Sequence, residues 1–319
     1  MKTLNWLTAA AFALAAACAQ AQTYPGKAIR FVVPFASGGP PDIIGRLLGQ
    51  RLGEAWGQPV LVENRPGAGG NTGSAQVAKA APDGYTVLVT TSAIAVNASL
   101  WANPGFDLDR DLIAVAHIAT SPNIFVAGTA SGIGTLREAL EKAKSGKFNY
   151  GSPGTGTTPN LSAEYLFRVL AKANVTHVPY KAGGPALTAA LTGEVDLVCV
   201  AVPGAVPLVR AGKLRGLAVT SAKRLAALPE VPTVEESGYP GFQHYTWVAL
   251  FVPAGTPVSV ISRINTDIEK LLALTEFRER LAALAFDPVG GSQESAARYV
   301  KAEIAKWATI VKATGARAE

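Results

Sequence analysis

The stretch FVVPFASGGPPDIIGRLL, residues 31–48, joins a β-rich run to a helical pattern through a loop of two glycines and two prolines. A helix that follows such a loop leaves its first N–H groups without partners, and the peptide dipoles add partial positive charge at its start. A helix start of this kind is suited to hold an anion. Pro40 and Pro41 fit the first turn because they lack the N–H that would go unpaired. We interpret the stretch as a strand, an anion-binding loop and a helix.

The same plan recurs in FNYGSPGTGTTPNLSAEYLF, residues 148–167, where hydroxyl side chains stand beside the glycines. These hydroxyls can donate or accept hydrogen bonds. In the first loop, Ser37 and the two glycines after it are the better candidates for contact with an anion. The carboxylate of Asp42 would repel an anion, so we expect Asp42 to hold the loop, as carboxylates do at helix starts.

Strand-like and helix-like segments alternate along the chain, which predicts parallel sheets wrapped by helices. From Val258 onward the pattern changes to three helical stretches, and Ser292 and Gly315 suit the start and the stop of the last one. No Ser/Gly-rich or Pro-rich linker separates two halves, so two domains would be joined by strands. The β-branched runs lie at 28–35, 59–65, 85–92, 124–129, 147–152, 175–180, 195–202, 214–221 and 245–255, and the three helical stretches at 258–274, 275–285 and 292–315.

The first residues have the features of a secretory signal: a basic start at Lys2, an apolar run up to Cys18, and small residues at Ala19 and Ala21. We expect residues 1–21 to be removed. A rival interpretation makes Cys18 a lipid-carrying residue, but Ala15 stands where lipoprotein signals usually have Leu. Removing 21 of 319 residues leaves 298, which is enough for two domains.

The mature chain retains a single cysteine, Cys199, so no internal disulfide is possible and the fold must depend on its hydrophobic core. No later apolar run is long enough to span a bilayer. The formal net charge of +6 is scattered along the chain without a basic run or interleaved aromatics, so we predict no nucleic-acid partner and only mild attraction for anions.

No nucleotide-binding or catalytic motif is present. The chain has neither G-x-G-x-x-G nor a P-loop nor G-x-S-x-G. Its three histidines, His117, His177 and His244, are far apart in sequence and lack metal-ligand spacing. We therefore predict no cofactor, no metal and no catalytic residue, although a triad assembled from distant residues stays open.

Seven segments, in order and without large gaps, resemble the Bug-type, or tripartite tricarboxylate transporter (TctC-like), periplasmic substrate-binding proteins. They include YPGKAIRFVVPFASGGPPDIIGRLL (24–48), VENRPGAGGNTGSAQVAKAAPDGYTVL (62–88) and HVPYKAGGPALTAALTGEVDL (177–197). The others are 148–167, 212–224, 228–242 and 250–257. The resemblance runs from about Tyr24 to the C-terminus.

This resemblance implies an α/β fold of the two-domain periplasmic-binding-protein type (Venus flytrap, type II), with parallel-rich sheets flanked by helices and with crossing hinge strands. Residues 22–121 and 244–319 would form domain 1 and residues 122–243 domain 2. The implied function is that of a periplasmic receptor, expected to be a monomer, that holds a small organic carboxylate in the interdomain cleft for the membrane permease subunits of a tripartite tricarboxylate-type transporter. Two alternatives stay open: a ligand-sensing partner of a membrane signalling protein, and a secreted hydrolase that uses one of the histidines.

The resemblance also implies a set of ligand-binding residues, two of whose neighbours depart from the family pattern. Asn160 stands where many relatives have His, and Val200 where many have an acidic residue. Without that carboxylate, we expect a carboxylate ligand that lacks a free amine, and an apolar or aromatic body is one option for it. Lys181 beside the set is expected to be solvated, and Tyr180 is equally well explained by core packing. The implied set is Phe35, Ala36, Ser37, Gly38, Gly39, Asp42, Ser92, Asn97, Ser152, Gly154, Thr155, Gly156, Thr157, Thr158, Tyr180 and Gly183.

Overall fold

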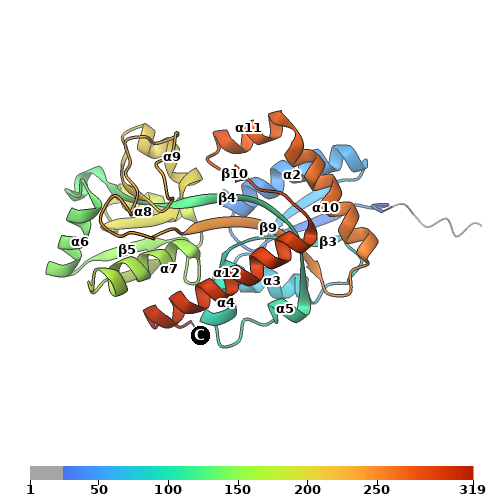
Figure 1. Cartoon of the computed structure of the whole chain (residues 1–319), viewed down its shortest axis with the longest axis horizontal. Coiled ribbons are helices and arrows are strands. Elements are labelled where there is room, and N and C mark those ends of the chain that lie inside the picture. The colour runs from blue at the N-terminus through green and yellow to red at the C-terminus, as the bar shows by residue number, and fades with distance from the viewer. Residues whose placement is uncertain (1–23, 319) are drawn as a thin grey trace, which may run out of the picture.

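Two β-sheets that share one long strand form two lobes, each with helices on both faces of its sheet (Figure 1). The structure is a computed structural model that describes residues 24–318. The predicted signal peptide, including Cys18, lies outside the described residues. Within residues 24–318 no helix is both long and apolar enough to cross a membrane.

The first lobe has the sheet order β2-β1-β3-β9-β4, in which β1 runs parallel to β2 and β3 while β9 runs antiparallel to β3 and β4. Successive side chains of β1 alternate between the faces, so Phe31 and Val33 pack under α2 and α10 while Val32 packs on the side of α4 and α12. The strands are β1 (Ile29–Val33), β2 (Val60–Asn64), β3 (Thr86–Thr91), β9 (Tyr245–Pro253) and β10 (Asp287–Pro288), and the helices are α2 (Pro40–Trp56), α3 (Asn71–Ala78), α4 (Ala93–Leu100), α5 (Leu108–Asp111), α10 (Val258–Ala273), α11 (Thr275–Ala283) and α12 (Gln293–Thr314).

The second lobe is built around β5, which pairs in parallel with β6 and β7. Its helix α6 shows how sequence fixes a helix: Leu136, Ala139, Leu140 and Ala143 bury one face, and the Thr135 hydroxyl accepts from the N–H of the first turn. The strands are β5 (Asn149–Ser152), β6 (Thr176–Pro179), β7 (Leu197–Ala201) and β8 (Leu214–Val219), and the helices are α6 (Leu136–Ser145), α7 (Thr158–Glu164), a π-helix η3 (Tyr165–Leu170), α8 (Gly183–Thr192) and α9 (Val202–Arg210).

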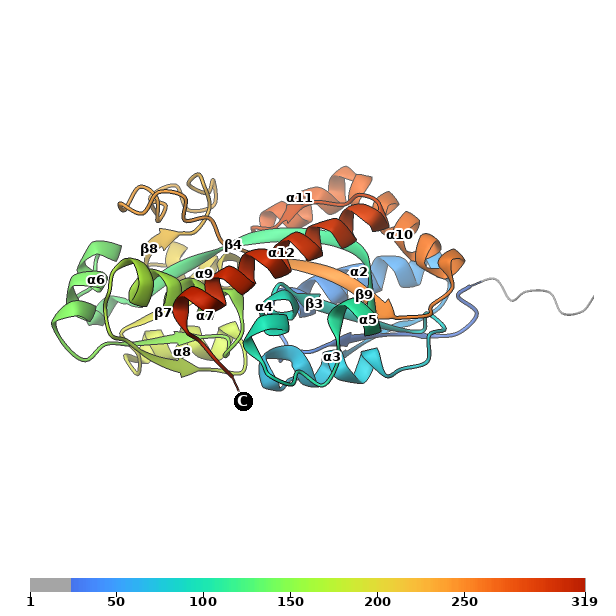
Figure 2. The ribbon, with the colours of Figure 1, turned by 60° about the horizontal axis from the view of Figure 1, so that its bottom comes forward.

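The lobes are joined by β4 (Leu112–Gly128), whose first part pairs with β9 and whose last part pairs with β7 and β8. The chain returns beside it, where the Thr220 N–H donates to the Asn123 carbonyl at 2.9 Å. The long helix α12 runs diagonally over the two segments, β4 and the chain leading into β9, where the polypeptide passes between the lobes (Figures 1 and 2). Its Trp307 ring lies 5.1 Å from the His244 ring, centroid to centroid.

The predicted α/β alternation is confirmed, including the start of α12 after Ser292 and its stop at Gly315, which has φ 65°. The predicted run at 124–129 was too short, because β4 begins twelve residues earlier at Leu112. Pro122, set between Ser121 and Asn123, breaks the apolar pattern there, and a proline normally argues against a strand. Here the crossing strand tolerates it, since its pairing partner changes from β9 to β7 at this point.

We predict that acid destabilises the fold through its buried histidines. Burial lowers the pKa of His117 to about 4, and burial together with the charge of Lys306 lowers that of His244 to about 3. The unfolded chain, with histidine pKa values near 6.5, therefore binds more protons as the pH falls, which favours unfolding by about 2 kcal/mol per histidine at pH 5. Urea unfolding followed by tryptophan fluorescence at pH 7 and pH 5 measures this loss.

The variant His117→Phe provides the control for this prediction. It keeps the ring that stacks on Tyr299 at 4.2 Å and removes a buried Nε2 that has no hydrogen-bond partner among the described residues. We expect the stability lost between pH 7 and pH 5 to be about 2 kcal/mol smaller in this variant. An unchanged loss would contradict the role assigned to His117.

Candidate functional site

A cavity of about 210 Å³ lies between the lobes. Both lobes line it, and none of the lining residues is Asp, Glu, Lys, Arg or His. The first lobe supplies Phe35, Gly38, Gly39, Pro40, Pro41, Ile43, Thr91 and Thr246, and the second lobe supplies Pro153, Thr157, Thr158, Pro159, Ala182, Gly183, Gly184, Leu187, Val200, Ala201, Pro203 and Gly204.

Four helices, α2, α7, α8 and α9, start at this cavity. Each follows the carboxyl end of a parallel strand, namely β1, β5, β6 and β7, which is the edge of an α/β sheet where ligands bind. The partial positive ends of the four helix dipoles therefore surround one space. Sequence reasoning found the starts of α2 and α7 and Gly183 of α8, but it missed α9, although VDLVCVAVPGAV shows the same strand, proline and helix plan.

Backbone N–H groups supply the polarity that charged side chains do not. Within residues 24–318, the N–H groups of Gly39, Thr158, Gly183 and Gly184 have no protein hydrogen-bond partner, and all four residues line the cavity. Each of the four helices also has a proline in its first turn, which removes one N–H without disturbing the helix. The remaining donors are free for a ligand.

Asp42 lies beneath the first loop and outside the cavity lining. Its carboxylate accepts from the Gly38 N–H at 2.9 Å and from Asn64 Nδ2 at 2.9 Å, and it is 2.9 Å from the Arg46 guanidinium. Burial alone would raise the pKa of Asp42, but the hydrogen bonds from Arg46, Gly38 and Asn64 outweigh it and hold the pKa below its usual value. The charged carboxylate thus fixes the loop, as the sequence predicted, and its charge is compensated locally.

A chain of buried hydroxyl groups runs from the cavity into the crossing strands. Thr246 Oγ1 donates to Asn123 Oδ1 at 2.7 Å, so the hydroxyl of Thr158, 2.7 Å away, must donate to Thr246, and Ser92 at 3.0 Å must donate to Thr158. Each hydroxyl has one hydrogen to donate. The hydroxyls of Thr158 and Thr246 are therefore committed to the protein, although both residues line the cavity.

The chain continues from Asn123 to a histidine. Asn123 Nδ2 donates to Ser162 Oγ at 3.3 Å, and Ser162 Oγ lies 3.0 Å from His244 Nδ1. Ser162 can donate to this nitrogen only while it is unprotonated, which agrees with the lowered pKa of His244. The polar chain thus links β9, β4 and α7 at the place where the lobes meet.

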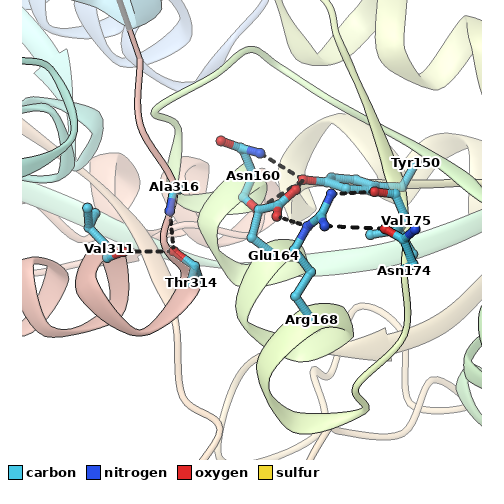
Figure 3. A network of polar contacts seen from close by, with 9 residues as sticks. All are labelled: Tyr150, Asn160, Glu164, Arg168, Asn174, Val175, Val311, Thr314 and Ala316. Carbon is cyan, nitrogen blue, oxygen red and sulfur yellow. Dashed lines mark hydrogen bonds and ion pairs between the residues drawn. The ribbon is translucent and has the colours of Figure 1, made fainter.

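A second network joins Asn160, Tyr150, Glu164 and Arg168 (Figure 3), and Asn160 connects it to the loop of residues 153–157. Asn160 Oδ1 accepts from the Gly156 N–H at 3.1 Å, and Asn160 Nδ2 donates to the Tyr150 hydroxyl at 2.8 Å. Tyr150 donates to Glu164, which is paired with Arg168. Burial, followed by the charge of Glu164, raises the pKa of Tyr150, so its hydroxyl stays protonated. Asn160 therefore serves the loop and does not line the cavity.

A groove of about 470 Å³ adjoins the cavity and shares Phe35 and Pro153 with it. At this groove the loops of the two lobes touch. A Cβ at Gly69 would lie 2.4 Å from the Thr155 carbonyl oxygen, and a Cβ at Gly156 would lie 2.1 Å from Asn97 Oδ1. Both glycines also have positive φ, so this closed contact requires glycine at both positions.

The residues of the implied set fall into three groups. Six line the cavity: Phe35, Gly38, Gly39, Thr157, Thr158 and Gly183. Gly154, Thr155 and Tyr180 line the groove with Phe35, and Tyr180 donates to Glu194 at 2.8 Å while burial and this carboxylate raise its pKa to about 12. Ala36, Ser37, Asp42, Ser92, Asn97, Ser152 and Gly156 line neither space.

The Ser152 hydroxyl lies 2.7 Å from His177 Nε2, which is a second pairing of serine and histidine beside that of Ser162 with His244. Ser152 is fully buried and lines neither the cavity nor the groove. Burial, with a smaller contribution from Arg168, lowers the pKa of His177 to about 4. Among the described residues, no three His, Cys, Asp or Glu side chains lie close enough together to hold a metal ion.

Comparison with known proteins places this geometry in a family. BugT of Bordetella pertussis is 34% identical over 306 residues, covering 95% of this chain and 94% of BugT. An R. palustris protein solved with adipate is 34% identical with a TM-score of 0.87, covering 92% of this chain and 98% of that one. MatC from Rhodopseudomonas palustris with bound malate is 32% identical with a TM-score of 0.85, covering 90% and 100%.

The predicted periplasmic-binding-protein fold is confirmed by the solved structure of the periplasmic binding protein BugD, which is 31% identical with a TM-score of 0.87, covering 93% of this chain and 100% of that one. The sequence model described as "Tripartite tricarboxylate transporter family receptor" matches residues 44–316, nearly the whole of the chain that the structure describes. The chain therefore belongs to the TctC family of tripartite tricarboxylate transporter receptors.

Proposed function

We propose that the protein is a periplasmic receptor that captures a small organic carboxylate in the cavity between its lobes and delivers it to the membrane permease subunits of a tripartite tricarboxylate-type transporter. The observation that carries the proposal is the convergence of four helix starts on one cavity without charged side chains. The carboxylates bound by two structural neighbours, adipate and malate, support the same class of ligand. In this proposal, a discontinuous domain of residues 22–121 and 244–319 and a second domain of residues 122–243 close on the ligand.

Backbone donors are sufficient for useful affinity. A hydrogen bond to a charged group contributes about 1.5–3 kcal/mol, and micromolar binding requires about 8 kcal/mol. The four free N–H groups, belonging to Gly39, Thr158, Gly183 and Gly184, would reach that scale if most of them bonded the ligand. Exclusion of water by the closed lobes strengthens each of these bonds.

We predict that a carboxylate stabilises the protein against heat. Melting of the mature protein, measured by differential scanning fluorimetry with a panel of mono-, di- and tricarboxylates, should reveal at least one stabilising acid. A ligand at 100 times its dissociation constant adds about 2.7 kcal/mol to the free energy of unfolding. The uncharged amides of the same acids serve as controls. If no carboxylate shifts the melting curve, or if the amides shift it equally, the proposed function is wrong.

We predict that Gly39→Val abolishes binding and leaves the fold intact. A Cβ at this position meets only Pro41 Cδ at 3.8 Å and the Ala36 carbonyl oxygen at 3.9 Å, and the backbone has φ −84° and ψ 169°, which valine adopts easily. The added methyl groups would occupy the cavity. The matched control is Gly146→Val, whose Cβ would face open space at the end of α6. Retained binding in Gly39→Val, measured calorimetrically, would contradict the assignment of the cavity.

We predict that Asn160→Ala weakens binding because the Gly156 N–H loses its acceptor and the loop loosens. Leaving buried groups unpaired costs about 1–3 kcal/mol of stability, and we expect affinity to fall about tenfold. Tyr150→Phe breaks the same network one step further away and keeps the bond between Asn160 and Gly156. It should lose stability but bind normally. Equal loss of affinity in the two variants would show that the network acts only through stability.

A further inference from the structure

Resting on the proposed function, we propose that the cavity selects carboxylates that carry no amino group and that have an apolar body about as long as a six-carbon acid. The lining of the cavity carries this inference. A receptor for an amino acid must supply hydrogen-bond acceptors for the ammonium group of the ligand and hydrogen-bond donors for its carboxylate. The described lining supplies unpaired backbone N–H groups and no carboxylate.

Among the described residues no acidic side chain lines the cavity, and the side-chain oxygens of Asp42 and Thr157 are engaged by the protein. The carboxylate of Asp42 is directed to Gly38, Asn64 and Arg46 beneath the loop. Thr157 Oγ1 lies 2.8 Å from the Gly154 carbonyl oxygen, to which it donates, and it accepts from the Asn160 N–H. An ammonium group would therefore lose its water shell without gaining a charged partner, which is strongly unfavourable.

The hydroxyl of Thr91 also acts as a donor at this cavity. Its oxygen accepts from the Ala93 N–H at 3.3 Å, and among the described residues it donates to none, so its hydrogen is available to an anion. Thr91 itself is 7% exposed. The four helix starts give the cavity a positive electrostatic character, and the Thr91 hydroxyl can turn its hydrogen toward an anion. That character repels an ammonium group as it attracts a carboxylate.

The remainder of the lining is apolar. Phe35, Leu187 and Val200 are buried, with exposed fractions of 8%, 4% and 1%, and they line the cavity with Ile43. The volume of about 210 Å³ has room for several water molecules and so admits a small acid of about six carbon atoms. Water released from these surfaces favours a hydrocarbon body over a hydroxylated one.

Matched ligand pairs test the inference on the unmodified mature protein by isothermal titration calorimetry. Hexanoate differs from norleucine, and adipate from 2-aminoadipate, only by the α-amino group. We expect the amine-free acid of each pair to bind at least tenfold more tightly. If the amino acids bind as tightly or more tightly, the inference is overturned while the proposed function stands. If none of the four acids binds, the inference is also overturned. The proposed function is then judged separately, by the melting measurements with mono-, di- and tricarboxylates.

Two variants test the role of the lining. Val200→Asp and Ile43→Asp each place a carboxylate at the cavity wall. Each should lower the ratio of the affinity for hexanoate to the affinity for norleucine by at least tenfold. The control is Val200→Asn, because the asparagine side chain has the shape of aspartate without its charge. This variant should keep the preference for hexanoate over norleucine. Ile43 is half-buried near the start of α2, where an acidic residue is tolerated, so this variant keeps the test valid if Val200→Asp does not fold. An unchanged preference in the folded acidic variants would overturn the inference.

Discussion

The structure depends on one constraint: parallel strands from two sheets end at the same place, so the helices that follow them must start there together. Each helix start carries partial positive charge that belongs to the backbone. Four such starts create a space that suits an anion, and among the described lining residues no buried cationic side chain has to be desolvated. The absence of Lys and Arg from the described lining is therefore no obstacle to anion binding, because the fold itself supplies the charge.

The crossing region holds the two sets of helix starts in alignment across the lobes. A continuous strand, β4, serves both sheets, and the hydroxyl chain from Thr158 through Thr246 and Asn123 ties α7 to it. The hydroxyls of Ser92, Thr158 and Thr246 each donate to one acceptor, and the chain ends at the contact between Ser162 and His244. Such a directed network favours one arrangement of the lobes, because another arrangement would leave a buried donor unpaired.

The local features of this fold could be predicted from sequence, whereas the non-local ones could not. The loop at 31–48 and the cap at Ser292 are set by neighbouring residues, so their patterns were sufficient. The first half of β4 escaped prediction because its pairing with β9 involves residues more than a hundred positions away. The start of α9 carried a readable signal that was overlooked. That Asn160 supports a loop instead of facing the cavity depends on Tyr150, and no spacing in the sequence reveals this contact.

At the cavity, the backbone supplies the hydrogen-bond donors and the side chains supply the apolar wall, so substitutions affect these two parts differently. The donors that face an anion are N–H groups, which most side-chain substitutions leave in place. The apolar wall consists of side chains such as Ile43, Leu187 and Val200, which substitution changes directly. A mutation in the wall can therefore alter which carboxylate is preferred while the anion-binding end is preserved. We therefore expect the fold to determine that a carboxylate group is bound, and the side chains of the wall to determine which carboxylate is preferred.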